Sequence, residues 1–345
     1  MLSASACSSE GSASESGGEG SSSTASTTVL AAADVPAVPS PGCQAASDPP
    51  AGGSEVHFEH EGQPRWYLQH VPVAHTPGSP VPLVIDLHGY LEGAALHSAL
   101  SGLGAYGDEH GFVTVTPQGS GEPVHWEANI GTDDVSMVMA MLDEVERNLC
   151  IDMARVYATG YSNGAFMTSV LACAHSDRIA AVAPVAGIRD VPDCDPDRPV
   201  PVIAFHGTED SFVQYEGGFG SGAAALPSPD GSGATMADLG DSALAASIMP
   251  GPIDQRVEDN LAAWADRNGC DDEAQDQAVS PEVTLITYDC PPDAAVEMYR
   301  VEGGGHAWPG SALSVSIGGV VGRTSMDIDA TALMWEFFQE NPLRP

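Results

Sequence analysis

The stretch Y157-A-T-G-Y-S-N-G-A-F166 places Ser162 between two glycines in the pattern G-x-S-x-G. This pattern is typical of a nucleophile elbow, in which a serine on a sharp strand-to-helix turn attacks a carbonyl carbon. The chain is rich in glycine and serine, so random placement alone gives roughly 0.4 matches, and the pattern needs support from its surroundings.

The residues around Ser162 provide that support. R155-V-Y-A-T159 is typical of a buried strand, and residues 163–175 carry apolar side chains at helical spacing. Small residues at Gly160 and Gly164 allow the strand and helix backbones to approach, and the start of the helix directs N–H groups at the serine. These features predict that Ser162 is a nucleophile rather than an ordinary loop serine.

A serine nucleophile needs a base and an orienting acid, which follow it in the order Asp, His in this type of fold. Asp210 comes just after an apolar stretch, as the acid requires; Glu209 and residues 190–197 are weaker alternatives. Of eleven histidines, only His306 lies in a loop shortly before a C-terminal helical pattern. We therefore expect a catalytic triad of Ser162, Asp210 and His306, with most other histidines at the surface.

The oxyanion hole of such a site uses two backbone N–H groups. One comes from the residue after the nucleophile, here Asn163, and the other from the loop after the third strand. That loop begins L87-H-G-Y90, so the N–H of Tyr90 is the expected second donor. His88 either shapes this turn or is a structural residue with its own hydrogen bonds.

Strand-like and helix-like stretches alternate along the chain and predict a mostly parallel sheet covered on both faces, an α/β fold. The expected strands are residues 55–60, 65–71, 82–89, 112–117, 155–159, 179–186, 199–207, 283–288 and 296–301, and the expected helices are 133–149, 163–175, 253–268 and 327–339.

Composition divides the chain into two parts. Residues 1–53 are mostly Ser, Gly, Ala, Thr and Pro, which predicts a disordered tether that contributes no core. Residues 54–345 have the size of one α/β domain. Within it, residues 217–252 form a Gly/Ala/Pro-rich insertion that either borders the site or is a surface loop.

The chain has 48 acidic and 11 basic residues, a formal charge of −37. Such a surface repels phosphate backbones and anionic membranes, so we expect no nucleic-acid partner. Either solubility or a preference for neutral or cationic substrates explains the charge. The cysteines form no C-x-x-C pair, which argues against zinc and thioredoxin-type chemistry, and we expect neither metal nor cofactor.

Cys7 stands apart from the other six cysteines, which allow three disulfides in fifteen pairings. The segment L2-S-A-S-A-C7 with its Ser/Gly-rich continuation is similar to the end of a bacterial lipoprotein signal. An ordinary serine-rich tail is the alternative. We expect a secreted or surface-anchored monomer whose only membrane attachment is a lipid at Cys7.

Several motifs together resemble the polyhydroxybutyrate depolymerase and feruloyl esterase family of α/β-hydrolases, in its bacterial lipoprotein branch. These motifs are H88-G, G160-Y-S-N-G164, H206-G-T-E-D210 and G303-G-G-H-A-W-P-G310. The likeness runs from about Trp66 to Trp335. Two departures are Tyr90, where many relatives carry Cys, and the insertion at 217–252.

The resemblance implies an α/β-hydrolase fold and the same triad, acting on carboxylic esters that include polymers. It also implies the disulfides Cys173–Cys194, Cys270–Cys290 and Cys43–Cys150. Trp126 and Trp308 match aromatic positions that, with Tyr90, line a substrate groove or else pack in the core. Two alternatives stay open, a serine peptidase on the same scaffold and a surface binding protein without catalysis.

Overall fold

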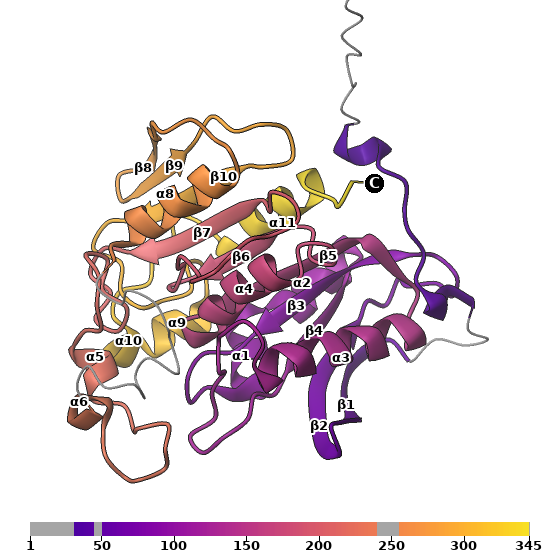
Figure 1. The fold of residues 1–345 in the computed structure, drawn as a ribbon, viewed down its shortest axis with the longest axis horizontal. Helices are drawn as coiled ribbons and strands as arrows, with labels where there is room; N and C mark the ends of the chain where they lie inside the picture. Colours follow the sequence, from indigo (N-terminus) through magenta and orange to yellow (C-terminus); the bar gives the residue numbers. More distant parts are fainter. Residues whose placement is uncertain (1–30, 45–49, 240–254, 345) are drawn as a thin grey trace, which may run out of the picture. The chain divides into compact units, whose positions relative to one another are not determined.

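The central feature of the fold is a ten-stranded sheet (Figure 1). A computed structural model describes residues 31–44, 50–239 and 255–344. The strand order is β1-β2-β4-β3-β5-β6-β7-β10-β9-β8, and the six strands from β4 to β10 are parallel. Antiparallel pairs extend both edges. The strands are β1 Gly52–His60, β2 Gln63–Val71, β3 Val81–Leu87, β4 Val113–Pro117, β5 Ile151–Tyr161, β6 Val182–Val185, β7 Val202–Gly207, β8 Gln275–Ser280, β9 Val283–Thr287 and β10 Val296–Val301.

Helices cover both faces of the sheet (Figure 1). Successive side chains of β3 point to opposite faces of the sheet, and each face has its own apolar cluster. Leu83 and Ile85 pack into one cluster, and Val84 packs into the other. The first cluster includes α3 Asp133–Asn148, α4 Asn163–Ala174 and α8 Val257–Arg267, and the second includes α1 Gly93–Ser101, α2 Leu103–His110 and α11 Ala330–Glu340. This arrangement and the strand order confirm the α/β-hydrolase fold.

The parallel strands bring distant parts of the chain to one edge. The carboxyl ends of four parallel strands, β3, β5, β7 and β10, form one edge of the sheet. Within this group, β3 pairs with β5 and β7 pairs with β10. The loops that follow these four strands contain the residues expected to form the site. This edge is where ligands bind in open α/β sheets.

The expected tether boundary at residue 53 is too late. Residues 31–44 belong to the same compact unit as the rest of the domain, with 3-10 turns at Ala32–Asp34 and Pro41–Gln44. Asp152 accepts a hydrogen bond from the Val38 N–H, and a disulfide joins Cys43 to Cys150. These contacts hold a segment whose composition alone favours disorder. Residues 1–30, with the proposed lipidation site Cys7, lie outside the described residues.

All the predicted strands and helices are present, with ends shifted by a few residues. The sequence does not predict α1 and α2, which contain several glycines, or β8, a polar and exposed edge strand. Short helices at α5 Ser221–Ala224, α6 Met236–Leu239, α9 Ala312–Ser316 and α10 Gly318–Val321 were also not expected. Residues 240–252 of the insertion, and the two residues after it, lie outside the described part.

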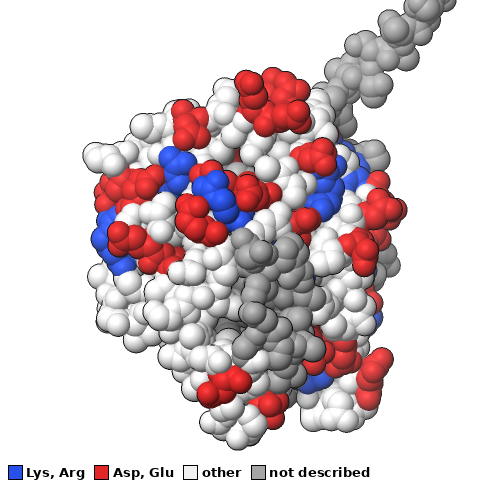
Figure 2. Space-filling view, turned by 60° about the vertical axis from the view of Figure 1, so that its left-hand side comes forward, with Lys and Arg blue, Asp and Glu red and all other residues white. Residues whose placement is uncertain are grey.

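In the view of Figure 2, acidic side chains cover more of the surface than the arginines do, and the arginines lie beside carboxylates. Ion pairs of the described residues include Arg300–Glu258 and Arg178–Glu146. Over the described residues, none of the helices combines the length and the apolar composition that crossing a membrane requires.

Candidate active site

Ser162 occupies the turn between β5 and α4, as the motif predicts. Its backbone has φ 56° and ψ −116°, a conformation that non-glycine residues rarely adopt. Such strain is typical of a nucleophile elbow, where it exposes the serine side chain above the sheet. The start of α4 follows immediately, so the positive end of the helix dipole lies next to the serine.

The two glycines of the motif are required by close packing. A Cβ on Gly164 would lie 2.1 Å from the carbonyl oxygen of Leu87, and one on Gly160 would lie 2.4 Å from the carbonyl oxygen of Gly164. Gly187, after β6, would similarly place a Cβ 2.6 Å from the Ser162 carbonyl. Helix α4 therefore approaches the ends of β3 and β5 more closely than any side chain allows.

Asp210 and His306 are brought together as the sequence predicted. His306 Nδ1 lies 2.7 Å from Asp210 Oδ2, and both side chains are buried. The other oxygen of Asp210 accepts the N–H groups of Phe212 and Val213 at 2.8 and 2.9 Å. Burial raises the pKa of Asp210, but His306, His206 and the Phe212 N–H outweigh it, so the pKa lies below its usual value. The carboxylate is thus charged and fixed in direction.

Close backbone contact joins the loops that carry this pair. A Cβ on Gly207 would lie 2.3 Å from the carbonyl oxygen of Gly304, and the Glu209 N–H donates to that oxygen at 2.8 Å. Glu209, the weaker alternative for the acid, therefore contacts the loop of His306 through its backbone N–H. The glycines before His306 allow the two loops to pack against each other.

Tyr161 connects the elbow to the histidine. Its hydroxyl donates to the His306 carbonyl at 2.5 Å, and the two rings lie 4.8 Å apart. The Phe212 ring also stacks on the imidazole, with 4.8 Å between the ring centroids. Within the described part of the chain, Ser162 Oγ makes no hydrogen bond to His306. Such contacts are often long before substrate binds.

The expected oxyanion donors are both free. Among the described residues, neither the Tyr90 N–H nor the Asn163 N–H has a hydrogen-bond acceptor. The Asn163 side chain is held by Trp126, whose N–H and carbonyl bind the Asn163 amide at 2.7 and 3.1 Å. The donor at Asn163 therefore has a fixed position.

Trp126 and Trp308 are both buried, which favours the second alternative for these two residues, packing in the core. Trp126 has no exposed surface, and its indole N–H donates to the His88 carbonyl at 2.8 Å. Trp308 is also buried, and its N–H donates to Thr331. Both rings gain more by packing in the core than on a surface. Tyr90 is partly exposed, and its hydroxyl donates to the carbonyl of Pro227 in the insertion.

The histidines outside the expected triad are less exposed than predicted. His88, His97 and His206 are buried, each with a polar partner. Burial lowers the pKa of His88 to about 4, so this ring is neutral. The partners of these histidines are either distant in the sequence or backbone atoms. No spacing pattern in the sequence therefore predicts that the three rings are buried.

In the part of the chain that the structure describes, one group of side chains could hold a metal ion, at the end of β1. His60, Glu61 and Asp133 place one ligand atom each within 4.8 Å of one another. Arg65 already pairs with Asp133 at 2.8 Å, and none of these residues lies on the loops that carry Ser162, Asp210 or His306. The group is therefore not part of the expected triad.

The three disulfides implied by the family resemblance are those of the structure. They join Cys43 to Cys150, Cys173 to Cys194, and Cys270 to Cys290. The first ties the N-terminal segment to the start of β5, and the second links the end of α4 to the loop before β7. Such bonds are typical of proteins from oxidising compartments.

Sequence comparison finds relatives with esterase names. A profile of the prolyl oligopeptidase family matches residues 106–198. Feruloyl esterase B of Piromyces equi is 27% identical over 247 residues, 68% of this chain and 41% of that protein. Poly(3-hydroxyalkanoate) depolymerase C of Paucimonas lemoignei is 38% identical over 131 residues, 35% of this chain and 30% of that protein. The chain thus spans less than half the length of these two relatives.

A solved structure has a similar fold. The acetyl xylan esterase from Aspergillus awamori matches 74% of this chain and 94% of its own, with a TM-score of 0.50 and 16% sequence identity. At that identity the match concerns the fold alone.

Proposed function

We propose that this chain, an α/β-hydrolase related to feruloyl esterases and polyhydroxyalkanoate depolymerases, is a serine esterase that acts through an acyl-enzyme. The observation that carries the proposal is the pairing of His306 with a buried, charged Asp210 next to a strained serine elbow. Esterase chemistry on this scaffold needs these three groups and no cofactor.

In the proposed reaction, His306 removes the Ser162 proton as the serine oxygen attacks the ester carbonyl. Asp210 holds the ring through Nδ1, which leaves Nε2 to take the serine proton in the proposed reaction. Its negative charge stabilises the imidazolium that forms. His306 then returns the proton to the departing alcohol, and the acyl group stays on Ser162.

The negative charge of the tetrahedral intermediate falls on the carbonyl oxygen. The free N–H groups of Tyr90 and Asn163 are the proposed donors, and removal of one such donor typically costs about 3 kcal/mol of transition-state stabilisation. Water, activated by His306, then attacks the acyl-enzyme and releases the acid. The same groups thus serve both halves of the reaction.

The proposed substrates are carboxylic esters with short or hydroxycinnamoyl acyl groups, polymers included. The names of the relatives support this range. The three disulfides support secretion, because the cytosol keeps thiols reduced. A lipid anchor at Cys7 and a monomeric state remain proposals from the sequence.

A series of p-nitrophenyl esters from acetate to palmitate, with methyl ferulate beside it, tests the function. We expect the highest kcat/KM for acetyl to butyryl or hydroxycinnamoyl esters, and loss of activity after treatment with a fluorophosphonate. The matching p-nitroanilides test the peptidase alternative, which the prolyl oligopeptidase match keeps relevant. Faster cleavage of anilides than of esters would reject the esterase proposal.

A further inference from the structure

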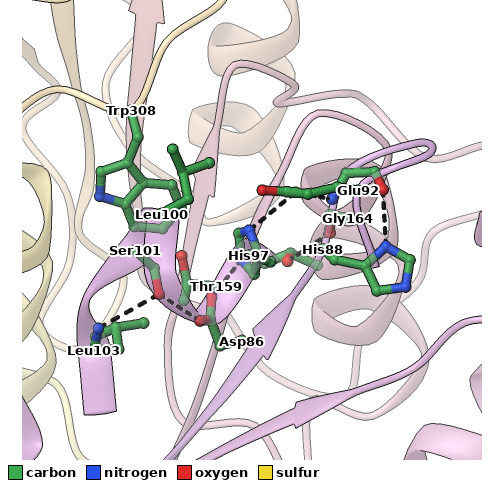
Figure 3. A network of polar contacts seen from close by, with 12 residues as sticks. Asp86, His88, Glu92, His97, Leu100, Ser101, Leu103, Thr159, Gly164 and Trp308 are labelled. Atoms are coloured by element: carbon green, nitrogen blue, oxygen red, sulfur yellow. Dashed lines mark hydrogen bonds and ion pairs between the residues drawn. The ribbon is translucent and has the colours of Figure 1, made fainter. Parts of the chain in front are cut away.

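A chain of buried charges lies beside the loop that follows β3 (Figure 3). Asp86, at the end of β3, contacts His97 of α1, with 2.6 Å between Oδ1 and Nε2. The other oxygen of Asp86 accepts the Ser101 hydroxyl at 2.6 Å. His97 Nδ1 lies 3.1 Å from Glu92 Oε2, an ion-pair distance without the angle of a good hydrogen bond. The Asp86 and His97 side chains are at most 1% exposed and that of Glu92 is 9% exposed.

The last member of this chain binds the backbone of the loop. Glu92 Oε2 accepts the N–H of Gly89 at 2.7 Å. Space at Gly89 is limited, because a Cβ there would lie 3.0 Å from the Tyr161 ring and 3.2 Å from Glu92 Oε2. Leu91, which lies between Gly89 and Glu92 in the chain, has φ 66°. This conformation is costly for leucine, so neighbouring contacts must maintain it.

The adjoining peptide unit contains the proposed oxyanion donor. The Gly89 carbonyl accepts from His88 Nδ1 at 2.8 Å and from the Glu92 N–H at 3.2 Å. His88 donates through Nδ1 because its Nε2 accepts the N–H of Gly119. The Gly89 carbonyl and the Tyr90 N–H belong to one planar unit and point in opposite directions, so holding the first directs the second.

We propose that Glu92 and His97 are positioning residues for the oxyanion hole: Glu92 fixes the Gly89 backbone so that the Tyr90 N–H points at the reacting oxygen, and His97, anchored by Asp86, fixes Glu92. This inference rests on the proposed esterase function. It assigns a role in the reaction to buried charges that contact neither Ser162 nor His306.

The charges of this network support each other. Burial lowers the pKa of His97, but Asp86 and Glu92 outweigh this effect and raise the pKa to about 10. Burial raises the pKa of Glu92, yet His97 and the Gly89 N–H bring it below its usual value. Glu92 is therefore a carboxylate at neutral pH, and a carboxylate holds an N–H about twice as strongly as a neutral acceptor does.

Glu92→Gln tests the proposal with little change in shape. We expect kcat on p-nitrophenyl butyrate to fall about 10- to 100-fold while KM stays within about threefold, because the oxyanion contact forms mainly in the transition state. A trifluoromethyl ketone forms a tetrahedral adduct with a serine. Its Ki should rise by the same factor by which kcat/KM falls.

His60→Gln is the matched control, since His60 is another largely buried histidine paired with a carboxylate, Asp133, away from this loop. It should leave kcat and Ki unchanged even if it lowers Tm. His97→Gln removes the residue that holds Glu92. It should give the same result as Glu92→Gln, a lower kcat and a higher Ki with KM nearly unchanged.

The outcomes separate the two proposals. An inactive wild-type protein contradicts the esterase function itself. An active wild type with unchanged kcat and Ki in Glu92→Gln overturns the positioning role alone. A purely structural network is also indicated if kcat falls while Ki does not, or if neither variant folds, and either result overturns the proposal.

Discussion

Gly164→Ala should damage both stability and catalysis, because the added methyl group has no space. Its Cβ would lie 2.1 Å from the Leu87 carbonyl oxygen and 2.6 Å from that of His88, both backbone atoms at the end of β3. Ordinary contact begins near 3.4 Å, so α4 and β3 must separate by about 1 Å.

That separation moves the serine elbow away from the oxyanion loop. Overpacking of this kind costs about 1–3 kcal/mol of unfolding free energy. In a domain of this size, Tm falls by roughly 2–4 °C for each kcal/mol. Misplacement of reacting groups by about 1 Å costs on the order of 100-fold in rate, so kcat/KM should fall by about that factor.

Thermal denaturation and p-nitrophenyl butyrate hydrolysis measure the two effects. Gly319→Ala is the control: it lies in the short helix α10, and a Cβ there meets nothing within 4 Å. It should keep wild-type activity and Tm or gain slightly. Wild-type Tm and kcat/KM in Gly164→Ala would refute the close packing of elbow and oxyanion loop.

The remaining predictions concern disulfides, charge and acyl length. Replacing Cys43 and Cys150 by serine should cost about 2–5 kcal/mol, seen in denaturant unfolding, because the bond closes a long loop; an unchanged midpoint contradicts this. His97 faces Asp86, Glu92 and the rings of Tyr161 and Trp308. Its pKa is raised to about 10, so the stabilisation from its positive charge is complete below about pH 6.5 and is lost as the pH rises through 10. The Tm difference between wild type and His97→Gln should therefore shrink from pH 6.5 to 10.5, and a constant difference argues against it. Activity should fall steeply beyond roughly eight acyl carbons; an optimum at laurate indicates a lipase.

The sequence predicts those residues of the site that directly follow a strand in the chain. Ser162, Asp210 and His306 follow apolar strands in the order that the fold requires, and the structure places these strand ends at one edge of the sheet. The glycine at 164 was expected for the same physical reason that the structure gives, close backbone approach.

What the sequence could not predict depends on contacts between distant residues. The sequence does not distinguish an aromatic residue that faces a groove from one that packs in the core. Both alternatives therefore stay open for Trp126 and Trp308 until the structure shows that they are buried. The Asp86–His97–Glu92 network joins a strand, a loop and a helix without a motif. Residues 31–44 resemble a tether in composition and are held by a disulfide and a few hydrogen bonds.

The central claim is that Ser162 is the nucleophile, and covalent labelling tests it most directly. Treat the protein with a fluorophosphonate, measure the intact mass, and locate the adduct by peptide mapping while following ester hydrolysis. We predict one adduct per chain, on Ser162, with activity lost in proportion and neither label nor turnover in Ser162→Ala. An adduct on another residue, or more than about a tenth of wild-type turnover in Ser162→Ala, would contradict the account.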